Sequence, residues 1–410
     1  MKVLQITTSI NGGAGIAALR LHKSLQDSNV KSGFLSIDLT VNFDNEVIDN
    51  SYFTYKRKTI FKRILSKIRS VIIPSYKFKQ TKKIKILKSE LSCEIATLPF
   101  SNYQLHNHPL VKEADIINLH WVSGILDYPS FFKNCKKPII WTLHDMNPFQ
   151  GVFHYRDDEN RNKHIIGSFD KEIKRFKGEK LNLINNGVYI APSNWMQEYA
   201  SRNLNSFSIK CISNSVDLNI FKIKDKVELR KKTSISSNEF VLLFVSDNLQ
   251  NPRKGFDLLI ESLFFLKKII SITVLVIGNG TLPEMENIKV LKLGNINNEH
   301  DMANWYSIAD LFVLPSREDN LPNVMLEAFS CGLPIISFTN GGMKEHLKLN
   351  KNGILIKNFN GKSLGEGILD FYKNKTDYNA SDIRKYAEDN FSFKKQADAY
   401  LKIYNKLYIK

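Results

Sequence analysis

Two adjacent cations follow a strand-like segment in the second half of the chain. Arg253 and Lys254 come after the apolar run 240–247 and open a helical pattern that includes Phe256 and Leu263. Cations and the unpaired N–H groups of a helix N-terminus both stabilise phosphate oxygens. We therefore expect Arg253 and Lys254 to bind a diphosphate. The alternative is that both are solvated loop residues without a ligand.

Acidic side chains gather in the segment 314–342, whose pattern is a strand, an acidic loop, a short helix, a strand and a Gly-Gly turn. Carboxylates accept hydrogen bonds from neighbouring hydroxyl groups. Glu318 or Asp319 at the strand end and Glu327 in the helix therefore suit ribose and hexose. The alternative for Glu327 is that it faces the core as a structural acid paired with another group.

A glycine pair and two histidines follow strand-like segments in the first half. Gly12 and Gly13 come after the segment 3–7, where glycine lets backbone amides approach a phosphate closely. His120 and His144 each follow a strand directly, where ligands of parallel sheets bind, although a lone histidine there can be structural. Together with the cations and acids of the second half, these residues predict a site in a cleft.

These residues need strands to position them, and apolar runs alternate with helical patterns along the whole chain, which predicts α/β domains with parallel sheets. The strand-like runs are 3–7, 114–121, 138–145 and 188–193, and then 240–247, 272–280, 288–294, 310–316 and 333–338. A single core stops growing at about 250–300 residues. We therefore expect two Rossmann-like, doubly wound domains, with a turn-rich hinge at 211–224. The domains would be 1–215 and 216–395, with the amphipathic end 396–410 packing back on the first.

The composition excludes several classes of protein. An apolar content of 43% with 24% charged residues is typical of a globular chain rather than a disordered one. The cysteines are too widely spaced for a zinc site or a disulfide framework: Cys93, Cys135, Cys211 and Cys331. The amino terminus has no signal-peptide pattern, and no apolar run is long enough to span a bilayer. We expect a cytoplasmic protein without a metal.

The basic charge is concentrated in residues 56–88, which hold thirteen Lys or Arg and no Asp or Glu, in a chain with a net charge of +17. Apolar residues recur there at helical spacing: Ile60, Phe61, Ile64, Leu65 and Ile68. Such a helix suits an anionic membrane surface, and a solvated basic face is the alternative. We expect no nucleic-acid partner, because no nucleic-acid-binding motif accompanies the charge.

Taken in order, several motifs resemble those of the retaining glycosyltransferases of family 4, which have the GT-B fold. The matching stretches are GGAG (12–15), TLHD (142–145), IAPSNWM (190–196), NPRKGFDLLIESL (251–263) and PSREDNLPNVMLEAFSCGLPII (315–336). The stretch LHDMNPFQGVFHY (143–155) is similar to members from bacterial capsule, exopolysaccharide and O-antigen clusters.

This resemblance implies two domains facing a central cleft and transfer of a hexose or related sugar, with retained configuration, from a UDP- or GDP-linked donor. It implies no metal and no cofactor. The acceptor would be a glycan, and the basic stretch suggests a lipid-linked one at the inner face of the cell membrane. Alternatives are a nucleotide-sugar epimerase or phosphorylase of the same fold, or a non-catalytic module that binds carbohydrate or membrane.

The resemblance also assigns roles to residues of the second half. Lys254, with Arg253 beside it, matches the cation on the departing diphosphate, and Glu327 matches the acid that holds the donor ribose. The acid that contacts the donor hexose falls at Glu318 or Asp319. The family's spacing favours Asp319, which lies one residue closer to Glu327.

Four further residues take roles from the resemblance. Asn320 and Leu321 lie beside the acid that contacts the hexose. His144 matches the histidine next to the transferred sugar, and Gly12 and Gly13 match the loop over the phosphates.

Overall fold

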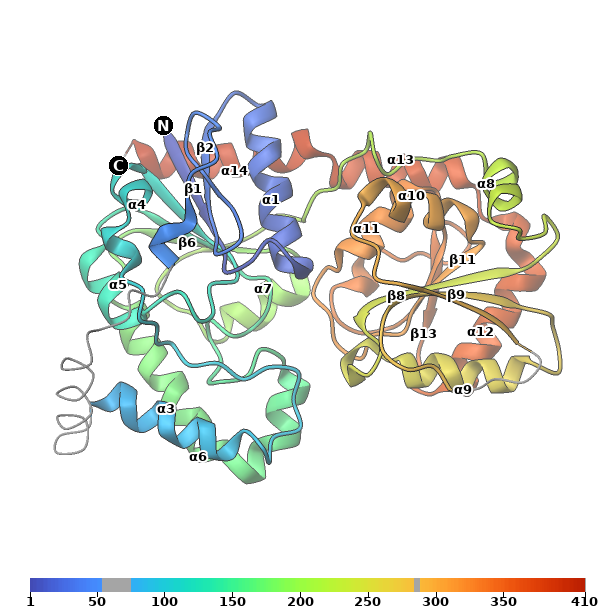
Figure 1. The fold of residues 1–410 in the computed structure, drawn as a ribbon, viewed down its shortest axis with the longest axis horizontal. Helices are drawn as coiled ribbons and strands as arrows, with labels where there is room; N and C mark the ends of the chain where they lie inside the picture. The colour runs from blue at the N-terminus through green and yellow to red at the C-terminus, as the bar shows by residue number, and fades with distance from the viewer. Residues whose placement is uncertain (54–74, 284–287, 410) are drawn as a thin grey trace. The chain divides into compact units, whose positions relative to one another are not determined.

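The computed structural model describes residues 1–53, 75–283 and 288–409, which form two compact units (Figure 1). The first unit consists of Met1–Ala191, Met196–Cys211 and Tyr400–Lys410, and the second of Pro192–Trp195 and Ile212–Ala399. The predicted division between residues 215 and 216 lies close to this one. The short segment Pro192–Trp195, which belongs to the second unit, differs from the prediction.

The first unit is built on a seven-stranded sheet of order β3-β2-β1-β4-β5-β6-β7. Its strands are β1 (Lys2–Ile6), β2 (Lys31–Leu35), β3 (Thr40–Val41), β4 (Ile116–Leu119), β5 (Ile139–Thr142), β6 (Gly187–Ala191) and β7 (Ile209–Cys211). All neighbours pair in parallel except β3, which is antiparallel to β2. The central strands are buried along their whole length, as parallel strands covered on both faces require.

The helices of the first unit follow its strands. They include α1 (Gly12–Asp27), α3 (Tyr76–Leu87), α4 (Pro109–Glu113), α5 (Tyr128–Asn134) and α6 (Arg156–Leu181), while α7 (Asn194–Ser201) starts in the second unit. One face of α1 is apolar and buried, through Ala17, Ala18, Leu21 and Leu25. Three acids lie in the first turn of α6, where they complement the helix dipole.

The second unit has a six-stranded parallel sheet of order β10-β9-β8-β11-β12-β13. Its strands are β8 (Val241–Asn248), β9 (Thr273–Asn279), β10 (Lys289–Gly294), β11 (Leu311–Leu314), β12 (Ile335–Phe338) and β13 (Gly353–Ile356). The main helices are α8 (Lys226–Lys232), α9 (Phe256–Leu266), α10 (Glu299–Ile308), α11 (Asn323–Ser330), α12 (Gly361–Asn374) and α13 (Ala380–Phe391). An apolar cluster lies on each face of this sheet.

Both sheets thus have the doubly wound, Rossmann-like order, and the α/β fold class predicted from the sequence is confirmed. In each sheet the order reverses next to the first strand, between β1 and β4 and between β8 and β11. The carboxyl ends of strands at such a reversal form the usual ligand-binding edge. The predicted site residues follow strands at or next to these two positions.

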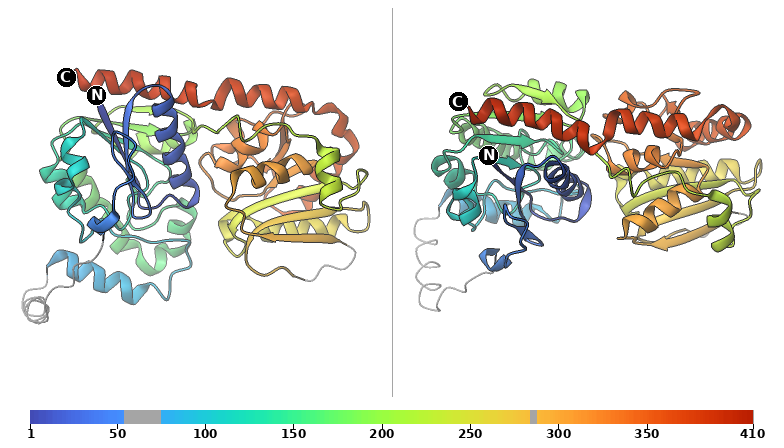
Figure 2. Two further views of the ribbon diagram at one scale, coloured as in Figure 1. Left: turned by 45° about the horizontal axis from the view of Figure 1, so that its top comes forward. Right: turned by 90° about the horizontal axis from the view of Figure 1, so that it is seen from above.

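The predicted amphipathic end of the chain lies in the last helix, α14 (Phe393–Tyr408), which follows α13 after a break. Ser392 has an extended backbone (φ −67°, ψ 149°), which ends α13 and separates it from α14, as Figure 2 shows in red. The predicted apolar stripe of α14 is buried at Ala397, Tyr400 and Tyr404. Because Tyr400 onward belongs to the first unit, the chain begins and ends in that unit.

The predicted basic helix lies partly outside the described residues. Residues 54–74, with the apolar positions from Ile60 to Ile68, are among those that the structure does not describe. The remainder of the basic stretch forms α3, whose N-cap Ser75 accepts a hydrogen bond from the backbone N–H of Phe78. Within the described ranges, no helix is both long enough and apolar enough to cross a bilayer.

Candidate functional site

Gly255 shapes the turn that carries the two predicted cations of the second unit. Arg253 and Lys254 lie in a 3₁₀ turn, Pro252–Lys254, between β8 and α9. Gly255 follows with a left-handed backbone (φ 69°), and a Cβ there would lie 2.0 Å from the carbonyl oxygen of Pro315. Glycine therefore lets the turn after β8 lie directly against the loop after β11.

The loop after β11 brings its carboxylate to these cations. Lys254 Nζ lies 2.7 Å from Asp319 Oδ2, and Arg253 Nη1 lies 3.2 Å from the same oxygen. Arg253 also donates to the carbonyl oxygen of Glu318 (3.0 Å). Burial opposes ionisation of Asp319, but the charges of Lys254 and Arg253 outweigh it and hold the pKa of that carboxyl below its ordinary value. The predicted cations and acid therefore form one charged cluster.

The members of this cluster differ in accessibility. Arg253 and Glu318 are buried, whereas the side chain of Lys254 keeps 21% of its surface exposed. A ligand anion can therefore reach Lys254 more readily than Arg253. The predicted role of Asp319 as a partner for sugar hydroxyls competes with its ion pair to Lys254.

Glu327 lies on α11, which begins after Pro322, and is 5% exposed. Tyr306, a fully buried residue of α10, donates a hydrogen bond from its hydroxyl to Glu327 Oε2 (2.9 Å). This bond fixes the orientation of the carboxylate. Leu321 is buried at the start of the same segment, and its carbonyl oxygen accepts a hydrogen bond from the Asn214 side chain (3.2 Å).

Asn320 is held from two other loops of the second unit. Its side-chain oxygen accepts a hydrogen bond from the hydroxyl of Ser193 (2.6 Å). The backbone N–H of Gly342 donates to the carbonyl oxygen of Asp319 (3.1 Å), and a Cβ at Gly342 would lie 2.0 Å from the carbonyl oxygen of Asn320. The Gly341-Gly342 turn after β12 thus packs its backbone against the acidic loop.

In the first unit, Gly12 and Gly13 form the start of α1 directly after β1. Gly12 has a left-handed backbone (φ 77°), and a Cβ on either glycine would meet no atom within 4 Å. The carboxylate of Asp38 accepts hydrogen bonds from the backbone N–H of Ile10 (3.0 Å) and from the Ser9 hydroxyl, which fixes the preceding loop. The two glycines therefore lie at a helix N-terminus with open space where a side chain would stand.

His144 follows β5 and stacks on His120, which follows the neighbouring strand β4. The two ring centroids are 5.2 Å apart at 21°, and His120 Nδ1 lies 2.9 Å from His144 Nε2. Burial lowers the pKa of His144 to about 4, although the charge of Asp145 opposes that shift. His144 is therefore neutral at physiological pH.

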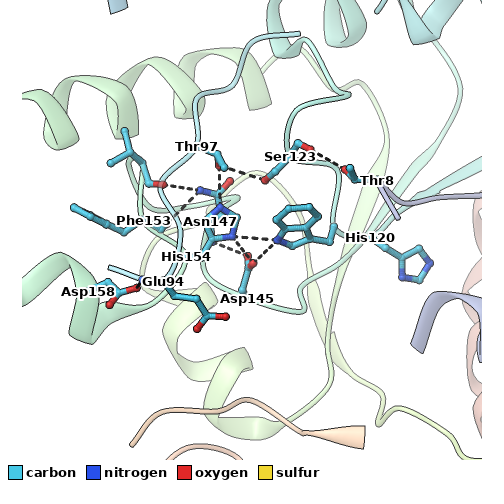
Figure 3. A network of polar contacts seen from close by, with 12 residues as sticks. Thr8, Glu94, Thr97, His120, Ser123, Asp145, Asn147, Phe153, His154 and Asp158 are labelled. Carbon is cyan, nitrogen blue, oxygen red and sulfur yellow. Dashed lines mark hydrogen bonds and ion pairs between the residues drawn. The ribbon is translucent and has the colours of Figure 1, made fainter. Parts of the chain in front are cut away.

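A second polar cluster lies in the loop after His144 (Figure 3). His154 lies between Asp145 and Thr97, with His154 Nδ1 2.6 Å from Asp145 Oδ2 and His154 Nε2 2.8 Å from Thr97 Oγ1. Trp121 Nε1 donates to the same carboxylate oxygen (2.9 Å). Burial again opposes ionisation, but His154 outweighs it and holds the pKa of Asp145 below its ordinary value.

Lys177 of α6 anchors that loop through two hydrogen bonds. Its ammonium donates to the backbone carbonyls of Asn147 (2.7 Å) and Gly151 (2.5 Å). The side chain is fully buried, and burial lowers the pKa of Lys177 to about 7 while the charge of Asp170 opposes the shift.

The structure thus brings Arg253 and Lys254 together with Asp319 in the second unit. Glu327 lies on α11, where its partner is Tyr306. The predicted residues of the first unit lie at the carboxyl ends of adjacent strands.

Sequence reasoning missed Tyr306, Ser193 and Lys177, since nothing near them in the sequence marks their partners. His154 lies in the stretch 143–155 that resembles the family, but the sequence analysis predicted no role for it. Over the described ranges, no group of three or more His, Cys, Asp or Glu could hold a metal ion.

Residues 225–390 match the family model described as "Glycosyl transferases group 1". Among characterised relatives, the chain is 22% identical to the D-inositol 3-phosphate glycosyltransferase of Thermobispora bispora over 59% of this chain and 58% of that protein. The chain thus spans less than two thirds of that relative.

Known structures of similar fold cover the whole chain. Sucrose-phosphate synthase of Thermosynechococcus elongatus matches with a TM-score of 0.66 and 16% identity, over 100% of this chain and 99% of that one. HepE of Anabaena matches with a TM-score of 0.64 and 19% identity, over 99% and 100%. The chain therefore has the GT-B fold, and residues 225–390 of its second unit are similar to the group 1 glycosyl transferases.

Proposed function

We propose that the chain is a retaining glycosyltransferase of family 4 that moves a hexose or related sugar from a nucleotide diphosphate to a glycan. The observation that carries this proposal is the charged cluster of Arg253, Lys254 and Asp319, which lies in the segment that matches the family model. Glu327, with its carboxylate oriented by Tyr306, adds a hydroxyl acceptor in the same segment.

The chemistry follows from the charge that develops as the sugar–phosphate bond breaks. Negative charge grows on the leaving diphosphate, and fixed cations that stabilise it lower the barrier. Lys254 is the accessible cation and Arg253 the buried one behind it. The diphosphate would compete with Asp319 for Lys254, so donor binding would free the Asp319 carboxylate for a hexose hydroxyl.

Retention of configuration follows from attack on the same face of the sugar. The acceptor hydroxyl attacks the anomeric carbon as the diphosphate leaves, and its proton passes to a phosphate oxygen of the leaving group. This route needs no enzymic nucleophile. Neutral His144 would then lie by the sugar as a hydrogen-bonding group rather than as a cation.

We favour a UDP-linked donor and keep GDP as the alternative. HepE of Anabaena, which shares the fold, has been crystallised in complex with UDP and with UDP-glucose. The Glu327 carboxylate suits the ribose of any nucleotide, so the base and the sugar depend on other contacts.

We further propose that the acceptor is lipid-linked, as in surface polysaccharide synthesis, and that α3 helps the enzyme to meet it at the inner membrane surface. Ile84 and Leu87 of α3 pack on a core cluster, while Phe78 (43%) and Ile86 (62%) are exposed. The lysines exposed beside them are Lys79, Lys82, Lys83, Lys85 and Lys88. Cations with exposed apolar side chains suit an anionic bilayer.

UDP binding tests the donor site. At a concentration one hundred times its dissociation constant, UDP should raise the free energy of unfolding by about 2.7 kcal/mol, visible as an upward shift of Tm. Lys254→Ala should remove most of this shift, and Lys268→Ala, which changes an exposed lysine beyond the end of α9, should keep it. No shift with UDP, GDP or ADP at millimolar concentration would refute the donor site.

Reaction products separate the alternatives. An epimerase would release free nucleotide without an acceptor, and a phosphorylase would consume inorganic phosphate. A non-catalytic module would bind carbohydrate or membrane without turning over any nucleotide sugar.

A further inference from the structure

A chain of buried polar side chains leads from His144 into the core of the first unit. His144 Nε2 lies 2.9 Å from His120 Nδ1, and His120 Nε2 lies 3.0 Å from Gln5 Oε1. Asn118 of β4, the strand between β1 and β5, donates to the same Gln5 oxygen (2.8 Å). Gln5 and Asn118 are fully buried and His120 is 3% exposed, so water does not compete for these bonds.

The chemistry of each group sets the direction of these hydrogen bonds. An amide oxygen can only accept, so the proton between Gln5 and His120 belongs to His120 Nε2. Burial lowers the pKa of His120 well below its ordinary value, so its ring is neutral and Nδ1 carries a lone pair. His144 Nε2 must then carry the proton that it donates to His120. In a neutral ring this leaves His144 Nδ1 as the accepting nitrogen.

The far end of the chain of bonds reaches helix α14. Thr142 Oγ1 donates to the side-chain oxygen of Asn118 (3.1 Å) and lies 2.9 Å from the hydroxyl of Tyr400. The Asn118 side-chain nitrogen lies 3.4 Å from the hydroxyl of Tyr404. Both tyrosines are fully buried, so this end of the network is shielded from water.

A buried polar network stabilises a core less readily than apolar packing does. Apolar residues of similar volume fill the space between a sheet and a helix without burying donors and acceptors that each require a partner. What the polar chain supplies is orientation, since each member fixes the proton position of the next. Its accessible end is His144, at the carboxyl end of β5.

We propose that His120 and Gln5 are positioning residues that hold the His144 ring in the tautomer protonated at Nε2. The tautomer is a property of the chain by itself. An effect of this tautomer on sugar transfer rests on the proposed function.

The tautomer can be measured directly on the wild-type protein without substrate. With ¹⁵N-labelled histidine, a protonated and an unprotonated ring nitrogen of a neutral imidazole resonate far apart, and loss of peaks in His120→Asn and His144→Gln identifies the two rings. We expect Nε2 protonated and Nδ1 unprotonated in both rings at pH 7. A His144 ring protonated at Nδ1, or averaged between the two forms, would overturn the proposal.

Two substitutions of His120 distinguish a role in positioning His144 from a role in filling space. His120→Asn keeps an oxygen acceptor near the position of Nδ1, whereas His120→Leu fills space without one. We expect the His144 tautomer and most of the turnover to survive in His120→Asn. In His120→Leu we expect a mixed tautomer and a kcat reduced roughly tenfold to a hundredfold with a smaller change in KM. Equal spectra and equal kcat in the two variants would contradict a positioning role.

A matched control removes a buried histidine elsewhere in the same unit. His22 is 4% exposed and pairs with the Ser32 hydroxyl at 2.9 Å, outside the network. His22→Leu should change stability without changing the His144 spectrum. If the protein proves to be no transferase, kcat is lost as a measure, but the wild-type spectrum still confirms or rejects the locked tautomer.

Discussion

In the proposed reaction, Lys254 and Glu327 would contact the donor in different ways, although both lie in the second unit. Lys254 would contact charge that exists mainly in the transition state, because the diphosphate gains its negative charge as the sugar leaves. A contact of Glu327 with ribose hydroxyls would be present in the ground state and in the transition state alike. Removal of one or the other should therefore change different kinetic constants.

We predict that Lys254→Ala lowers kcat by roughly a hundredfold or more, while Glu327→Gln mainly raises KM for the donor. Steady-state kinetics with the preferred nucleotide sugar measure both effects. Lys268→Ala is the control for loss of an exposed lysine. A normal turnover number in Lys254→Ala would exclude that residue from the chemistry.

At the residue scale, the sequence predicted the types and order of the charged residues but not how they pair. Lys254 and Asp319 stand in motifs, and the parallel strands β8 and β11 bring those motifs to one edge of a sheet. Their ion pair depends on the close approach of Gly255 to Pro315, a backbone contact that no motif encodes. Tyr306 was missed because its hydroxyl reaches Glu327 from a separate helix.

At the scale of elements, helix α6 supports the loop after β5 through one buried lysine. The pKa of Lys177 is lowered to about 7 from an ordinary value of 10.5 in water. Between these two values the unfolded chain binds more protons than the folded protein. The folded state therefore becomes more stable as pH rises through this window, and below pH 7 the cost of the buried charge is fully present.

We predict that the free energy of unfolding of the wild type, relative to Lys177→Met, rises between pH 7 and pH 10. Denaturant titrations of both proteins at several pH values measure this difference. Lys174→Met is the control for loss of a lysine from the same helix, because Lys174 donates to the Asn203 side chain rather than to the loop after β5. Parallel pH profiles for the wild type and Lys177→Met would contradict the lowered pKa.

Helix α3 carries the membrane proposal at the same scale. Each lysine near an anionic surface is worth about 1 kcal/mol, so changing Lys79, Lys82, Lys85 and Lys88 together to Gln should weaken vesicle binding by up to about a thousandfold at low salt. Co-sedimentation with vesicles of neutral or anionic lipid, at low and high salt, measures the effect.

The control for α3 changes four exposed lysines of the second unit to Gln: Lys231, Lys232, Lys268 and Lys362. This variant loses the same charge and should keep its binding. Equal binding to neutral and anionic vesicles, or an equal loss in both variants, would leave α3 as a solvated basic face.

Strands were predicted well where apolar runs are long and less well at short strands. The runs at 240–247 and 272–280 form the buried central strands β8 and β9. The strands β2, β3, β7 and β13 were not predicted. β3 and β7 have only two and three residues, and in β2 (KSGFL) and β13 (GILI) the apolar run begins only after a glycine.

At the scale of the whole molecule, the alternation of strands and helices was enough to predict two doubly wound units. The second unit can be matched by sequence to group 1 glycosyl transferases, whereas the family model does not extend to the first. Loops and helices in the first unit, such as α3 and the cluster around His154, depend on contacts distant in sequence. Sequence therefore predicts the second unit in more detail than the first.

Retaining, metal-independent sugar transfer from a nucleotide diphosphate is the central claim, and the anomeric NMR spectrum of the first product tests it most directly. The protein is incubated in EDTA with an α-linked UDP-sugar and either an acceptor or water alone. We predict that UDP is released and that the sugar first appears as the α-anomer, with Lys254→Ala at least a hundredfold slower. A β-anomer as first product, or turnover abolished by EDTA and restored by a divalent cation, would contradict this account.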